Sequence, residues 1–160
     1  MKLAEVGGRL LVETIRRLHA GTLTPQPQDN SKATLAPLLK KEDGLIAWTV
    51  SATDIANRIR GLSPWPGAYA YAGGERWILS RASAEDAASS TAGDALPGTV
   101  VEVRKDALII ATGQGLLALK EFQPANSRRM TVPQYLAGHT IAPDLVLGPG
   151  PEAGQATDAG

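Results

Sequence analysis

The spacing of apolar residues changes at Gly67, and this change limits the folds open to the chain. Before Gly67, apolar residues recur at helical spacing. After it, they form short runs with a period close to two, separated by turn residues, as in β-strands. Five short strands with few helices favour a mainly β fold, a small open barrel related to the oligonucleotide-binding fold. We predict these strands over 68–72, 76–82, 98–104, 107–112 and 115–122.

Two short helices are predicted to accompany the strands. One covers 52–62, because Ser51 and Asp54 form a start similar to a capping box. The other begins near Thr131. The stretch 84–97 is rich in Ala, Ser, Asp and Gly and shows no periodicity, so we expect a flexible loop there.

The N-terminal part of the chain differs from the rest. Apolar residues at helical spacing, with charged residues between them, predict an isolated amphipathic helix over 2–19. The sequence offers no evident partner for its apolar stripe, so we expect the stripe to pack against a second copy or to be disordered. The polar, proline-rich segment that follows predicts an extended linker. The expected division is a terminal helix over 1–20, a linker over 21–40, a barrel domain over 41–148 and a disordered tail over 149–160.

Composition excludes several classes of protein. The chain has no cysteine, which excludes a disulfide framework and thiolate metal sites. No apolar run approaches the length of a membrane span, and Lys2, Glu5 and Arg9 interrupt any signal peptide, so we expect a cytoplasmic protein without a membrane partner. The formal net charge is +0, so any nucleic-acid contact must come from a local basic surface.

No residue of this chain is predicted to be catalytic or to bind a metal. The two histidines are far apart, His19 at a helix C-terminus and His139 at the end of the short helix, where capping or surface roles are expected. The segment Gly113-Gln114-Gly115 lies between two predicted strands, so it indicates a hairpin turn and not a phosphate loop. The sequence shows no Gly-x-Ser-x-Gly nucleophile motif.

One aromatic residue allows two interpretations. Trp65 lies between Pro64 and Pro66, which fix its backbone, so the indole could anchor the core or offer a stacking platform for a base. The tight connection between the helix before it and the strand after it favours the core.

Six basic residues are the candidates for a surface that contacts phosphates. They are Lys41, Arg58, Arg60, Lys120, Arg128 and Arg129.

Several segments, taken in order, resemble the methionyl-tRNA formyltransferase family. The most specific are Lys41-Glu42-Asp43-Gly44 and Pro64-Trp65-Pro66-Gly67-Ala68, similar to the linker region and to the entry of the C-terminal domain. The helix over 2–19 resembles the last helix of the catalytic domain, and the resemblance extends to about residue 148. The family commonly has Lys where this chain has Leu38, so one basic contact of the linker is missing. Further matching positions are 24–28, 33–34, 36–37, Trp48, 59–61, 97–98, 113–124 and 129–139.

The resemblance implies a role in translation initiation. In the family, a Rossmann-like N-terminal domain with catalytic Asn, His and Asp residues transfers a formyl group from 10-formyltetrahydrofolate to the amino group of methionyl-tRNA. The C-terminal barrel helps to hold the initiator tRNA. The resemblance therefore implies a tRNA-binding accessory domain of a transferase used in protein biosynthesis, inactive alone and without a cofactor of its own. Its partners would be initiator methionyl-tRNA and the N-terminal catalytic domain.

Two alternatives stay open. One is the C-terminal domain of another folate-dependent formyltransferase, acting on a sugar nucleotide. The other is an autonomous interaction domain that forms a homodimer through the helix over 2–19.

Overall fold

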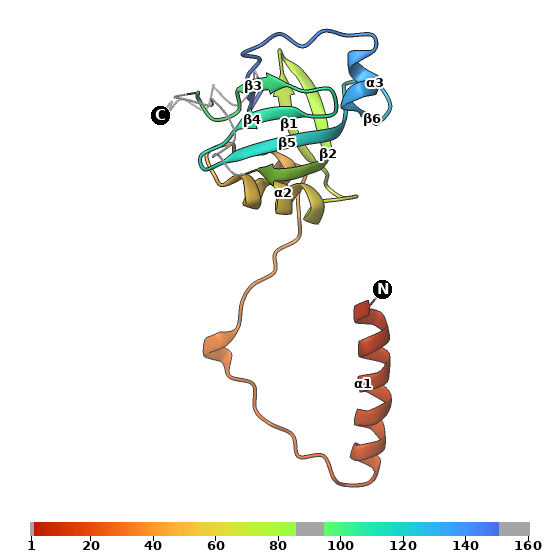
Figure 1. The fold of residues 1–160 in the computed structure, drawn as a ribbon. Helices are drawn as coiled ribbons and strands as arrows, with labels where there is room; N and C mark the ends of the chain where they lie inside the picture. The colour runs from red at the N-terminus through yellow and green to blue at the C-terminus, as the bar shows by residue number, and fades with distance from the viewer. Residues whose placement is uncertain (1, 86–94, 151–160) are drawn as a thin grey trace, which may run out of the picture. The chain divides into compact units, whose positions relative to one another are not determined.

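A computed structural model describes residues 2–85 and 95–150 of the chain (Figure 1). The chain divides into two compact units, Met1–Pro37 and Leu38–Gly160. Most of the predicted loop over 84–97 and of the predicted tail over 149–160 lies outside the described residues. The finer division into a helix, a linker, a barrel domain and a tail stays a prediction.

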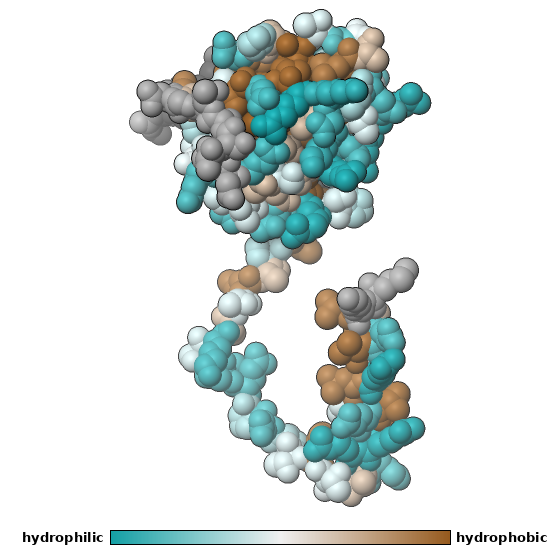
Figure 2. Space-filling model, in the orientation of Figure 1, coloured by the Kyte–Doolittle hydropathy of each residue, from teal (hydrophilic) through white to brown (hydrophobic). Residues whose placement is uncertain are grey.

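The first unit contains helix α1, Lys2–His19, followed by a chain with one short 3₁₀ helix, η1, Asn30–Lys32. An exposed ion pair between Glu5 and Arg9, 2.6 Å apart, supports α1 over one helical turn. Most of its large apolar residues lie along one side of the helix, as Figure 2 shows, and these residues are exposed. They are Leu3, Val6, Leu10, Leu11, Ile15 and Leu18, and we call them the α1 stripe.

The second unit is built on one antiparallel sheet. Its strands follow the order β3-β4-β5-β2-β1-β7, and β6 pairs with β5 off this path. The mainly β prediction is therefore confirmed. The strands are β1 (Ala68–Ala72), β2 (Glu75–Glu85), β3 (Val100–Val103), β4 (Leu108–Ala111), β5 (Leu116–Gln123), β6 (Met130–Thr131) and β7 (Leu147–Gly148).

The sheet curls into a small open barrel (Figure 1). The segment before β7 joins its two edges, because the amide of Val100 donates to the carbonyl of Leu145 and that of Leu147 donates to Gly98, each over 2.8 Å. These bonds satisfy backbone groups that the edge strands would otherwise leave unpaired.

Two α-helices and a 3₁₀ helix accompany the sheet: η2 (Glu42–Gly44), α2 (Ala52–Gly61) and α3 (Val132–Leu136). The Ser51 hydroxyl accepts a hydrogen bond from the amide of Asp54, 3.1 Å away, which caps α2 as the sequence predicts. Thr131 and Gln134 form a full capping box at α3. In Figure 1, α2 lies along β2.

The core contains most of the aromatic residues of the chain. Trp77 stacks on Phe122 with ring centroids 4.4 Å apart, and Tyr135 of α3 packs against both rings. Trp48 is also buried. A second, smaller cluster of buried residues includes Ile109 of β4, so that β4 is buried on both faces.

The prediction that Trp65 anchors the core is wrong, because its side chain is 56% exposed. A backbone hydrogen bond, and not the indole, stabilises the tight connection between α2 and β1. The amide of Gly67, with φ of +82°, donates to the carbonyl of Leu62 over 3.0 Å. This turn leaves the indole on the surface.

Candidate nucleic-acid interface

The six basic candidates from the sequence lie on several elements of the second unit. Lys41 precedes η2 directly, and the Arg58 guanidinium of α2 donates to the backbone carbonyl of Asp43 in η2. Arg60 lies in the last turn of α2. Lys120 lies on β5, and Arg128 and Arg129 precede β6.

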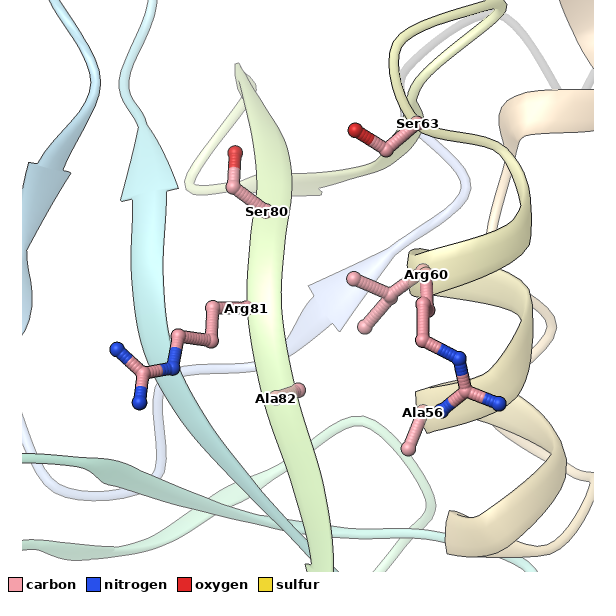
Figure 3. A pocket seen from close by; sticks show the side chains of 7 residues that line it. Ala56, Arg60, Ser63, Ser80, Arg81 and Ala82 are labelled. Carbon is pink, nitrogen blue, oxygen red and sulfur yellow. The ribbon is translucent and has the colours of Figure 1, made fainter. Parts of the chain in front are cut away.

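Arg60 shares a cavity with an arginine that is not among the six candidates. This cavity, of about 310 Å³, lies between α2 and β2, and we call it the α2–β2 cavity. Arg81 of β2 lines it together with Arg60 (Figure 3). Both side chains are basic, and no carboxylate lines the cavity among the residues that the structure describes.

Arg81 also connects this cavity to a second hollow of about 290 Å³. Lys120 of β5 lines the second hollow, together with Asp106, Glu121 and Thr131. The Arg81 guanidinium pairs there with the Glu121 carboxylate, 3.1 Å away. Basic and acidic side chains therefore meet in this hollow, whereas both charged residues in the described lining of the α2–β2 cavity are arginines.

Arg128 and Arg129 are exposed in the connection between β5 and β6. The connection is held by the Gln123 side-chain amide, which donates to the carbonyl of Ser127 over 2.8 Å. Arg129 stands two residues before Thr131, which lines the second hollow. Basic residues thus occur in succession from α2 across β2 and β5 to the start of β6. We call them the basic track: Arg60, Arg81, Lys120, Arg128 and Arg129.

Two other arginines, Arg104 and Arg76, contact carboxylates or an aromatic ring outside these two hollows. Arg104 pairs with Glu85 at 2.8 Å and with Glu102 at 2.9 Å, and its hydrogen bonds to Glu102 and Glu85 raise the pKa of its guanidinium. Arg76 lies over the ring of Tyr69, 3.9 Å from its centroid. Neither residue belongs to the basic track.

Two other kinds of site are absent from the part of the chain that the structure describes. Within 2–85 and 95–150, no three His, Asp or Glu side chains group closely enough to hold a metal ion. None of the helices in these ranges combines the length and the hydropathy needed to cross a membrane.

Sequence comparison adds close relatives. Residues 38–140 match the family described as "Formyl transferase, C-terminal domain". The methionyl-tRNA formyltransferase of Desulfotalea psychrophila is 43% identical over 146 residues, which cover 91% of this chain and 44% of the relative. The enzyme of the same name from Acidobacterium capsulatum is 44% identical over 150 residues, covering 91% and 46%. The chain thus spans less than half the length of these relatives.

Structural comparison supports the fold. The crystal structure of HypX from Aquifex aeolicus in complex with tetrahydrofolic acid matches 79% of this chain and 22% of that protein, with a TM-score of 0.52 and 21% sequence identity. At this identity the likeness concerns the fold alone.

Proposed function

Because the chain belongs to the formyl transferase C-terminal domain family, we propose that it is the tRNA-holding part of a methionyl-tRNA formyltransferase. The resemblance to this family that the sequence indicates is confirmed. The proposal beyond it concerns the ligand, initiator methionyl-tRNA, and thereby a role in translation initiation in the cytoplasm.

The observation that carries the proposal is the basic track. Arg60 and Arg81 line one cavity, and Arg81 and Lys120 line the next, so three basic residues follow one another over α2, β2 and β5. A row of cations matches the regular negative charge of a nucleic-acid backbone, and neutralising each phosphate releases counterions. Such cations fix the position of the RNA without reading its sequence.

The proposal assigns the chemistry to another part of the enzyme. Formyl transfer from 10-formyltetrahydrofolate would take place in the part of the full-length relatives that this chain does not match. The exposed α1 stripe would pack against that part, since an apolar stripe of this width normally faces a core. The chain alone would bind no folate and would be inactive.

The alternatives have less support. A sugar-nucleotide enzyme is not favoured, because the relatives described above are named for methionyl-tRNA. An autonomous domain that dimerises through α1 draws support from the α1 stripe, and its oligomeric state can be measured.

A salt titration of the binding of initiator tRNA to this chain tests the proposal. We expect weak binding at about 20 mM salt that disappears as salt rises, with a slope set by the number of phosphates neutralised. Absence of any affinity at low salt would overturn the proposal for this chain. Dimerisation without RNA binding would support the autonomous domain instead.

A further inference from the structure

The α2–β2 cavity combines three kinds of lining. Ala56, Ile59 and Ala82 form apolar walls. The other lining residues are two serines, Ser63 and Ser80, and the two arginines described above. The volume of about 310 Å³ is at the lower end of the range for small-molecule sites.

A β-bulge places Ser80 in this cavity. Leu79 pairs with Phe122 and Arg81 pairs with Glu121, so Ser80 is an extra residue on β2 without an opposite partner. Bulges redirect side chains and are common beside functional sites. In Figure 3 the hydroxyls of Ser80 and Ser63 lie toward the same end of the cavity.

The Ser80 hydroxyl is buried, and it has no hydrogen-bond partner among the described residues. A hydroxyl offers one donor and two acceptor positions, and burying it without a partner costs free energy. A ligand with a polar edge would satisfy it.

Neither guanidinium points into the cavity (Figure 3). Figure 3 shows the charged ends of Arg60 and Arg81 pointing away from its centre, in different directions. The centre is therefore apolar with hydroxyls at one end, and the charge lies outside it. This arrangement does not suit a phosphate group inside the cavity.

We propose that the α2–β2 cavity takes one unstacked nucleobase of a bound RNA. The faces of the base would lie against Ala56, Ile59 and Ala82, and its polar edge would hydrogen-bond to Ser63 and Ser80. Arg60 and Arg81 would hold the phosphates on either side. Proteins that recognise specific RNA positions bind mainly unpaired bases of this kind. Each hydroxyl can donate or accept a hydrogen bond, so the site tolerates different bases. The inference rests on the proposed function.

The experiment compares two RNA hairpins that differ only in one bulged nucleotide, 2-aminopurine in one and an abasic residue in the other. The 160-residue chain should bind the 2-aminopurine hairpin about ten-fold more tightly and change its fluorescence, since burying the faces of one base against apolar side chains contributes on this scale. Equal affinity for the two hairpins, together with normal salt-dependent binding of initiator tRNA, would overturn the inference and leave the proposed function standing. No binding of either hairpin or of the tRNA at low salt would overturn both.

Ala82→Leu fills the cavity and leaves every charge in place. It should reduce affinity for the 2-aminopurine hairpin to that for the abasic one, with the salt slope unchanged. Ala84→Leu is the matched control, because Ala84 lies on the same strand and lines a different hollow. An Ala82→Leu protein that folds and keeps its preference for the base would contradict the inference.

Ser80→Ala is a second test, and it does not require the fold to accommodate a larger side chain. Without this hydrogen bond, binding of the 2-aminopurine hairpin should weaken about three- to ten-fold. Because the hydroxyl has no partner among the described residues, the thermal unfolding temperature should not fall. Lower stability with unchanged base preference would assign Ser80 a structural role and contradict the inference.

Discussion

The guanidinium of Arg81 pairs with the carboxylate of Glu121, Nη1 to Oε1 over 3.1 Å, where the pairing of β2 and β5 shifts register twice. Arg81 is 67% exposed at its side chain and Glu121 is 27% exposed. The carboxylate therefore offsets part of the positive charge in the middle of the basic track.

Glu121→Gln should strengthen RNA binding. Removing the carboxylate frees Arg81 for a phosphate, and an exposed pair of this kind contributes less than about 1 kcal/mol, so affinity for initiator tRNA should rise by up to about five-fold at low salt. Fluorescence anisotropy with labelled tRNA measures the change. Glu102→Gln is the control, because Glu102 pairs with Arg104 outside the track. An equal gain in both variants would show a general charge effect and not a local one.

The double variant Arg128→Gln and Arg129→Gln should reduce the salt dependence of tRNA binding. Removing one cation that neutralises a phosphate lowers the slope of log affinity against log salt by about 0.9, so we expect a reduction of between about 1 and 2 for the pair. Arg76→Gln provides the comparison, since Arg76 lies over Tyr69 and outside the track. If Arg76→Gln lowered the slope of log affinity against log salt and the double variant did not, the RNA would bind away from the basic track.

The sequence predicts most elements of this fold because each depends on local spacing. The strand over 68–72 and the helix over 2–19 match β1 and α1 in both bounds. The predicted strand over 98–104 is longer than β3, because the residues before Val100 turn to bond with the segment around β7. β6 and β7, with two residues each, are too short to produce a periodic pattern.

The site was harder to predict, since it depends on pairing between distant segments. Arg81 and Glu121 are 40 positions apart, and their contact follows from a bulge that the sequence of β2 does not reveal. The sequence also allows two placements for Trp65, and only the turn at Gly67 decides between them. The sequence identifies basic residues as candidates, but it does not show which of them lie side by side on the surface.

Gly98→Ala should destabilise the barrel strongly. Gly98 has φ of +96°, and a Cβ there would press on the carbonyl of Leu147 and lie 3.2 Å from Cδ1 of Trp48. Strain and displacement together should lower the free energy of unfolding by at least about 2 kcal/mol. Gly61→Ala is the matched control in α2, where a Cβ meets nothing within 4 Å, and should be neutral or stabilising by up to about 1 kcal/mol. Urea unfolding compares them, and similar stabilities would contradict this packing at Gly98.

The barrel should lose stability in alkaline solution through Tyr135. Burial of its phenol, with a smaller contribution from the charge of Glu75, raises the pKa of Tyr135 above its ordinary value. The folded protein therefore holds this proton more tightly than the unfolded chain. The resulting stability is fully present below about pH 10 and is lost as the pH rises through the raised pKa. Between about pH 8 and values above about pH 10, the free energy of unfolding measured with urea should fall less in Tyr135→Phe than in the parent protein. Parallel pH profiles for the two proteins would rule out this contribution.

Deleting residues 1–37 should remove self-association and leave the barrel intact. The main core cluster of buried residues runs from Ile46 to Leu147, so the second unit contains its own core, and its unfolding temperature should change by less than about 2 °C. The α1 stripe is exposed, and an isolated 18-residue helix has little stability without packing against a partner. The 160-residue chain should therefore self-associate as its concentration rises. Sedimentation velocity measures this, and Leu10→Glu should act like the deletion because it places a charge in the stripe. A helical, monomeric 160-residue chain at about 100 μM would show that α1 needs no partner.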